Sequence, residues 1–222
     1  MKKNFALIIT LICCMAASAQ VNKWDSTFRP NNYAMKVEQF RGYKNDTKDI
    51  VFLGNSITAG TDWMELLGNS FVRNRGISGD ITFGILERLD EVTEGKPSKI
   101  FILIGINDIS RNIPDSVILN NYRKIISRIK SESPKTKIYF NTILPVNNEF
   151  TPSKNQFNKD EHVLYVNKEL SKICEKEKVT IIDSYTHFLD TNNKLKKEFT
   201  YDGLHLTPKG YKHWATLLKK HL

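Results

Sequence analysis

Short apolar runs alternate with amphipathic helical patterns along most of the chain. Five runs have the length of strands, and four of them are dense in Ile, Val, Leu and Phe without alternation. A continuous apolar run of this length is typical of a strand that is buried on both faces. The run FVRNR is more polar than the others. The five predicted strands are Asp49–Gly54, Phe71–Arg75, Lys99–Gly105, Lys137–Ile143 and Val179–Asp183.

Helical spacing of apolar residues occurs before, between and after these strands. The pattern predicts helices over Tyr33–Phe40 and Ile81–Leu89, and a last helix from Pro208, where Thr207 provides a cap. Two further helices present the faces Ile118, Tyr122, Ile125, Ile129 and Val163, Val166, Leu170, Ile173. Strands that alternate with helices predict one α/β domain with right-handed crossovers and a parallel sheet covered on both faces.

The first twenty residues, MKKNFALIITLICCMAASAQ, have the layout of a secretory signal peptide. A basic start is followed by an apolar stretch, and Ala17-Ser18-Ala19 fits a cleavage site of small residues. This stretch is too short for a membrane span, and no later run is long and apolar enough to cross a bilayer. We therefore expect a signal peptide over residues 1–19, a single domain over 20–222, and export to the periplasm or beyond in a bacterium.

Cysteine count and charge limit the partners. Without the signal peptide only Cys174 remains, which excludes an intrachain disulfide and a cysteine-based metal site. Loss of Lys2 and Lys3 leaves 31 basic against 24 acidic residues, a net charge of +7. The lysines are interspersed with glutamates, as over residues 168–178, and this mixture is typical of a solvated surface.

We therefore expect no nucleic-acid partner, no stable membrane insertion and no cofactor. Histidines and acids show no HExxH or comparable spacing, so no metal is expected. A surface protein that binds polyanions stays an alternative that depends on the net charge alone. No sequence pattern indicates the oligomeric state.

Residues suited to acyl chemistry follow the predicted strands. Ser56 comes directly after the first strand, in VFLGNSITAG, and Gly79 lies in a glycine-spaced loop after the second. Asn107 follows the third strand, and Asp202 and His205 precede the last helix. In doubly wound sheets, reactive groups gather in loops at the carboxyl ends of the strands. We therefore expect these five residues to meet at one edge of the sheet.

Each residue type has a role in ester hydrolysis. Ser56 is the predicted nucleophile, which must lose its proton to the imidazole of His205, and Asp202 holds that imidazole. The backbone N–H groups of Ser56 and Gly79 and the side-chain amide of Asn107 are the predicted oxyanion donors. Two alternatives remain open: Ser56 as a helix cap and His187 as a rival base.

Four short blocks carry a family resemblance: GNSIT at 54–58, GISGD at 76–80, GIND at 105–108 and DGLH at 202–205. In this order they resemble the four conserved blocks of the SGNH hydrolases, also called the GDSL esterase/lipase family. The resemblance implies a flavodoxin-like three-layer α/β/α sandwich with a five-stranded parallel sheet. It also implies the triad Ser56, Asp202 and His205 and an oxyanion hole of Ser56, Gly79 and Asn107.

The segments RGISGDIT and DGLHLTPKGYKHWATLL are similar to the platelet-activating-factor acetylhydrolase-like branch and to bacterial carbohydrate acetylesterases, such as sialate O-acetylesterases. The sequence departs from the family at Asn55, where the family usually has Asp before the serine. The predicted function is a secreted serine esterase that removes small acyl groups, above all O-acetyl, from sialic acid or another glycan. A lysophospholipase or thioesterase, and a non-catalytic glycan-binding module, are the alternatives.

Three aromatic residues are predicted to line the substrate cavity. Trp63 follows the serine turn, and Phe150 and Phe157 belong to the long segment 145–160. This segment follows a strand and is expected to overhang the site. Its polar sequence, NNEFTPSKNQFNKD, favours a small acyl group over a long one, since a long acyl chain needs an apolar groove.

Overall fold

A computed structural model describes residues 24–222, and its centre is a sheet of five parallel strands. The strand order is β2-β1-β3-β4-β5, that of flavodoxin-like doubly wound sheets, so the predicted fold class is confirmed. The signal peptide predicted over residues 1–19 lies outside the described residues. The strands are β1 (Ile50–Gly54), β2 (Val72–Gly76), β3 (Lys99–Leu103), β4 (Lys137–Asn141) and β5 (Thr180–Ile182).

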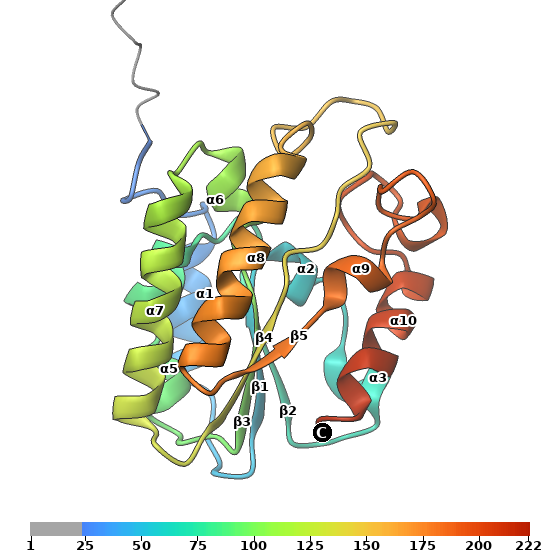
Figure 1. The fold of residues 1–222 in the computed structure, drawn as a ribbon. Coiled ribbons are helices and arrows are strands. Elements are labelled where there is room, and N and C mark those ends of the chain that lie inside the picture. The colour runs from blue at the N-terminus through green and yellow to red at the C-terminus, as the bar shows by residue number, and fades with distance from the viewer. Residues whose placement is uncertain (1–23) are drawn as a thin grey trace, which may run out of the picture.

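Helices cover both faces of the sheet (Figure 1). The long helices α7 and α8 pack side by side over one face, while α3 and α10 lie together on the other (Figure 1). None of the described helices has the length and apolarity that a membrane span requires. The helices are α1 (Tyr33–Arg41), α2 (Ser56–Ala59), α3 (Trp63–Leu67), α4 (Thr82–Glu87), α5 (Asp90–Thr93), α6 (Ile106–Ser110), α7 (Asp115–Glu132), α8 (Asp160–Lys176), α9 (Ser184–His187), α10 (Pro208–Lys219) and the 3-10 turn η1 (Lys197–Phe199).

Aromatic side chains fill the two layers between sheet and helices. On one face Phe52 of β1 stacks on Trp63 of α3, with ring centroids 4.4 Å apart, and Trp214 of α10 meets Trp63 edge-on at 4.9 Å. On the other face Phe140 of β4 packs against Tyr122 of α7 at 4.9 Å. Because the strands are buried on both faces, their sequences show no alternation of polar and apolar positions.

Two strands, β3 and β4, end two residues earlier than the sequence predicts, because side chains bond the backbone groups that follow. β3 ends at Leu103, and the hydroxyl of Tyr122 donates to the carbonyl of Ile104 at 2.8 Å. β4 ends at Asn141, and both polar atoms of the Asn167 amide bond the backbone of Ile143, at 2.7 Å and 2.9 Å. Apolar composition alone does not reveal such replacements.

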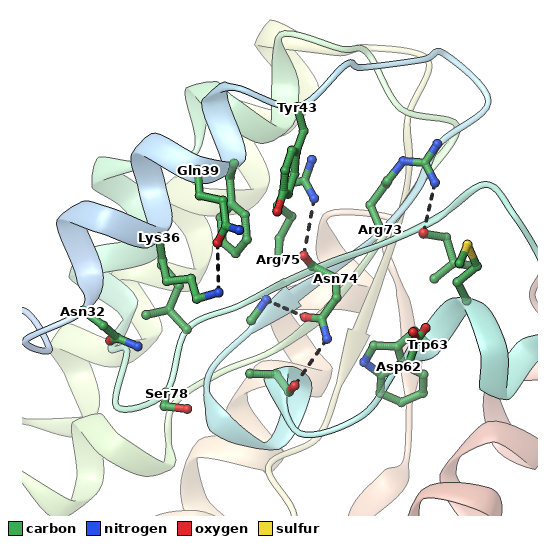
Figure 2. Close-up of a pocket in the computed structure, with 16 residues that line it drawn as sticks. Asn32, Lys36, Gln39, Tyr43, Asp62, Trp63, Arg73, Asn74, Arg75 and Ser78 are labelled. Carbon is green, nitrogen blue, oxygen red and sulfur yellow. Dashed lines mark hydrogen bonds between the residues drawn. The ribbon is translucent and has the colours of Figure 1, made fainter.

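β2 forms an edge of the sheet, which explains the polarity of FVRNR. Its own side chains bond the backbone groups on its open side: Asn74 Oδ1 accepts from the Gly76 amide at 2.9 Å, and Arg75 Nη1 donates to the Asn74 carbonyl at 3.3 Å (Figure 2). The cavity beside this edge, about 620 Å³ in volume, lies between α1 and α3. Because these groups are already bonded, the edge is protected against pairing with another strand.

Candidate active site

The turn after β1 presents Ser56 at the start of α2. A side chain at Gly54 would collide with Thr58 and with the carbonyl of Leu103, so only glycine fits where the strand ends. Asn55 is buried, and its Oδ1 accepts from the amide of Ile57 at 3.0 Å, which makes Asn55 the N-cap of α2. The interpretation of Ser56 as the helix cap is therefore wrong, and the hydroxyl of Ser56 is left for other partners.

A chain of hydrogen bonds joins Ser56, His205 and Asp202. Ser56 Oγ lies 3.0 Å from His205 Nε2, and His205 Nδ1 lies 2.7 Å from Asp202 Oδ2. The other carboxylate oxygen of Asp202 accepts from the amides of Leu204 and His205, at 3.0 Å and 2.7 Å. The turn is fixed by its own backbone, so the imidazole is held with one nitrogen on a carboxylate and the other on the serine. This is the geometry that activates a serine nucleophile.

The Asp202 carboxylate is well stabilised in its charged form. Partial burial raises its pKa, but hydrogen bonds from His205, Leu204 and Lys154 outweigh this effect and hold the pKa well below its usual range. Lys154 Nζ lies 3.1 Å from Asp202 Oδ2. The carboxylate is therefore ionised at any pH at which His205 can act as a base.

Gly79 and Asn107 lie on the same cavity as His205. Gly79 has a φ of +82°, a conformation that favours glycine. Asn107 Nδ2 donates one hydrogen to the carbonyl of Asp80 at 3.0 Å, and Gln156 Nε2 donates to Asn107 Oδ1 at 3.3 Å. These bonds fix which way the Asn107 amide points and leave its second N–H for a ligand.

Ser56 is the first residue of α2, so its amide has no acceptor within the helix. Its N–H is therefore free to bond a ligand, as is the second N–H of the Asn107 amide. The cavity that Gly79, Asn107 and His205 line has a volume of about 650 Å³, and Ser56 is not among its lining residues. Its lining residues are Trp24, Asp25, Gly79, Asn107, Ser110, Arg111, Ser153, Lys154, Asn155, Gln156, Leu204 and His205.

None of the three aromatic residues predicted for the substrate wall lines this cavity. Trp63 is 1% exposed and donates from its indole N–H to the carbonyl of Thr58, so it is a core residue. Phe157 is buried against Gly203, and the half-buried Phe150 packs at the same place. The prediction is wrong for these residues because their rings turn inward. The segment predicted to overhang the site does so, but through Ser153 to Gln156.

The rival base His187 lies in α9, away from Ser56. Its ring is 6.5 Å from that of His213, and its carbonyl is 3.0 Å from His213 Nε2. Within residues 24–222, no group of three or more His, Cys, Asp and Glu side chains is arranged to hold a metal ion. His205 is therefore the imidazole that the structure places at the serine.

Arg88 is a buried residue that was not predicted to support the site, and it bonds the backbone at the ends of two strands. Arg88 Nη2 donates to the carbonyls of Gly54 and Arg75, at 3.3 Å and 2.9 Å, where β1 and β2 end. Its Nε donates to Asp80 Oδ2 at 3.1 Å and its Nη1 donates to Glu91 Oε1 at 3.0 Å. Arg88 thus links the serine turn to the loop that carries Gly79. The signal available in the sequence was an Arg on the apolar face of the predicted helix over 81–89.

Asp108, next to Asn107, is fully buried and binds the start of α4. Its carboxylate accepts from the Thr82 amide at 3.0 Å and 3.1 Å and from the Thr82 hydroxyl at 2.6 Å. Burial raises the pKa of Asp108 to about 7, against the hydrogen bonds from Thr82, which lower it. Asp108 therefore supports the loop and does not face the cavity.

This pKa predicts a pH-dependent stability. Between about pH 4 and 7 the folded protein keeps a proton on Asp108 that the unfolded chain has lost. The unfolded chain binds fewer protons in this interval, so the contribution of Asp108 to the free energy of unfolding falls as the pH rises. We expect this fall to be about 2–3 kcal/mol between pH 5 and pH 8 and to be absent from Asp108→Asn.

Urea unfolding of both proteins at pH 5 and pH 8 measures this difference. Asp90→Asn is the control, because Asp90 is an exposed carboxylate, and it should keep the pH dependence of the wild type. An Asp108→Asn protein with the wild-type dependence on pH would contradict the prediction.

Comparisons with known proteins show the family of this chain. The GDSL-like Lipase/Acylhydrolase family matches over residues 52–213. Platelet-activating factor acetylhydrolase IB subunit alpha2 of Homo sapiens is 26% identical over 174 residues, which cover 76% of this chain and 73% of that protein. A solved structure from Streptococcus pneumonia, provisionally described as a platelet activating factor, is 30% identical, with a TM-score of 0.77 over 86% of this chain and 92% of that one.

An acetylxylan esterase from Geobacillus stearothermophilus has the same fold at 18% identity, with a TM-score of 0.65 over 79% of this chain and 94% of that one. The family match covers most of the chain. This chain therefore belongs to the GDSL-like lipase/acylhydrolase family, and the resemblance seen in the four sequence blocks is confirmed. It is a carboxylic ester hydrolase.

Proposed function

We propose that the protein is an exported serine esterase that removes acetyl groups from O-acetylated sugars, with an acidic sugar such as sialic acid as the alcohol part of the ester. The observation that carries the proposal is the chain of hydrogen bonds from Ser56 Oγ through His205 to Asp202, at 3.0 Å and 2.7 Å, beside a polar cavity. Export is supported by the signal-peptide pattern of residues 1–19.

The reaction follows from the arrangement of these groups. Ser56 Oγ attacks the carbonyl carbon of the ester while His205 Nε2 takes the hydroxyl proton. The oxyanion accepts hydrogen bonds from the Ser56 and Gly79 amides and from the Asn107 side chain. Collapse of this intermediate breaks the bond to the alcohol oxygen, which receives the proton from His205. Water then attacks the acetyl-serine by the same route in reverse, which releases acetate and restores Ser56.

The lining of the cavity favours a polar alcohol and a small acyl group. Most of its residues carry polar or charged side chains, and the segment over Ser153 to Gln156 offers no apolar groove for a long chain. Trp24 is the one aromatic residue without a charge in this lining, and it is stacked on Phe83, with ring centroids 5.9 Å apart. A fixed indole face suits the C–H side of a sugar ring, which it can bury.

The position of Arg111 favours a substrate whose sugar carries a carboxylate. Its guanidinium lies over the ring of Phe28, which holds it in place at the wall of the cavity. It forms no ion pair with any carboxylate of residues 24–222, and Asp25 on the same wall attracts it from a longer distance. A planar guanidinium with free N–H groups binds a carboxylate through two parallel hydrogen bonds.

The names of two relatives support acetyl as the acyl group that is removed. One is an acetylhydrolase and another is an acetylxylan esterase, so each is named for the release of acetyl. Hydrolysis of p-nitrophenyl acetate, butyrate and octanoate by residues 20–222 tests this directly. We expect acetate to be hydrolysed fastest. Preference for octanoate would favour a lysophospholipase or thioesterase, and no turnover of any ester would favour a glycan-binding module.

The role of Arg111 predicts a substrate-dependent effect. Arg111→Gln should lower kcat/KM for 9-O-acetyl-N-acetylneuraminic acid by about 10–100-fold, because a hydrogen bond to a charged group contributes about 1.5–3 kcal/mol. It should change kcat/KM for p-nitrophenyl acetate by less than about threefold, since that ester has no carboxylate.

The methyl ester of the same sugar is the matched substrate, since it lacks the negative charge. The wild-type protein should prefer the free acid, and Arg111→Gln should treat both alike. Arg123→Gln removes a charge from α7 outside the cavity and should behave as the wild type. Equal kcat/KM of the wild type on acid and methyl ester would exclude carboxylate recognition by Arg111.

A further inference from the structure

Lys154 contacts the triad carboxylate from a distant part of the chain. The connection between β4 and α8, yellow in Figure 1, rises beside the red loops that precede α10. It places Lys154 Nζ 3.1 Å from Asp202 Oδ2, the oxygen that lies 2.7 Å from His205 Nδ1. Both side chains are mostly buried, with exposed fractions of 24% for Lys154 and 21% for Asp202. One oxygen is therefore shared between an ammonium group and the imidazole.

The same segment is fixed on either side of Lys154. Gln156 Nε2 donates to Asn107 Oδ1 at 3.3 Å, and Phe157 is buried against Gly203, one residue after Asp202. Lys159 Nζ donates to the carbonyl of Ile109 at 2.9 Å. These contacts hold the segment over the site, so the Lys154–Asp202 pair belongs to a built structure and not to a freely moving side chain.

We propose that Lys154 is a positioning residue that acts through Asp202 to extend the activity of the enzyme toward acidic pH. The inference rests on the proposed function, in which His205 is the base. A carboxylate beside an imidazole stabilises the protonated ring, which cannot take a proton from serine. The ammonium group of Lys154 offsets part of this charge. The enzyme therefore stays active to a lower pH than the charge of Asp202 alone would permit.

No other described group is placed to do the same. The titratable and charged groups beside His205 are Asp202, Lys154 and Tyr201, whose ring stacks on the imidazole with centroids 6.0 Å apart. Asp25 and Arg111 lie further along the wall of the cavity. Among these groups Lys154 is the one cation that touches the carboxylate.

The test is the pH profile of kcat/KM for p-nitrophenyl acetate. The acid limb of this profile reports protonation of the base in the free enzyme. In Lys154→Met we expect this limb to move about 0.5–1 pH unit toward higher pH, a modest shift because the pair is partly exposed to solvent. Lys154→Arg keeps the positive charge and should keep the wild-type limb.

Two controls separate this effect from loss of structure or of charge in general. Lys197→Met removes an ammonium group that pairs with Glu149 away from the triad, and its acid limb should match the wild type. Unfolding of Lys154→Met by urea is the second control, and a midpoint close to that of the wild type shows that the fold is intact. A merely structural role would lower the plateau without moving the limb.

Superimposable acid limbs of the wild type and Lys154→Met would overturn the inference. The proposed function fails separately: in that case Ser56→Ala would retain activity, whatever the pH profile of Lys154→Met. If the acid limb of Lys154→Met does not shift but Ser56→Ala is inactive, the proposed esterase function holds and only the role of Lys154 is refuted.

Discussion

Ser56→Ala is expected to lower kcat/KM for p-nitrophenyl acetate by at least about 10⁴-fold, and by up to about 10⁶-fold. The reason is that the variant lacks the atom that attacks the ester, while the oxyanion donors and the cavity remain. Residual catalysis from those groups sets the upper limit of the expected loss. The measurement is steady-state hydrolysis at the pH of maximal wild-type activity.

Ser171→Ala is the matched control for this experiment. Its hydroxyl donates to the carbonyl of Asn167 within α8, outside the cavity, so its kcat/KM should stay within about twofold of the wild type. Retention of more than a tenth of the wild-type activity by Ser56→Ala would contradict the role of Ser56. In that case the structure offers no other serine paired with a histidine among the described residues.

The second large effect concerns stability. Arg88→Met is expected to lower the free energy of unfolding by about 3–5 kcal/mol, because it leaves Asp80 and Glu91 buried without their shared cation. It also removes the donor to the carbonyls of Gly54 and Arg75. Urea unfolding followed by circular dichroism measures this difference.

An exposed ion pair provides the comparison. Arg41 pairs with Asp90 at 2.9 Å, and both side chains are more than half exposed, so Arg41→Met should cost less than about 1 kcal/mol. Equal losses in the two variants would mean that the Arg88 network contributes no more than a surface pair. If Arg88→Met does not fold, Glu91→Gln, which keeps the shape of the side chain, gives a second measurement of the same network.

The elements and their order followed from local patterns. Four of the five strands were dense apolar runs because both faces of the sheet are covered, and each long helix kept one apolar face toward the sheet. The ends of β3 and β4 were predicted two residues too late because Tyr122 and Asn167, which are distant in sequence, bond the backbone there. Such contacts leave no mark on the apolar pattern.

The residues at the site were predicted because topology gathers them. In a parallel sheet every strand delivers its following loop to the same edge, so Ser56, Gly79 and Asn107 had to lie near one another. The aromatic residues were assigned to the wall by their position in the chain alone. Trp63, Phe150 and Phe157 turn toward the core, since an aromatic ring is stabilised where it is buried.

The sequence by itself determined the parallel α/β architecture and which residues follow the strand ends, because periodicity and connection order are local properties of the chain. Only the tertiary structure decided which contacts support those residues. Three of these contacts join separate segments of the chain: Arg88 to Gly54, Lys154 to Asp202, and Arg111 to Phe28. The fourth, the cap of α2 by Asn55, depends on how the turn after β1 is folded. Their geometry depends on the path that each loop takes through space, which close packing of the whole domain sets.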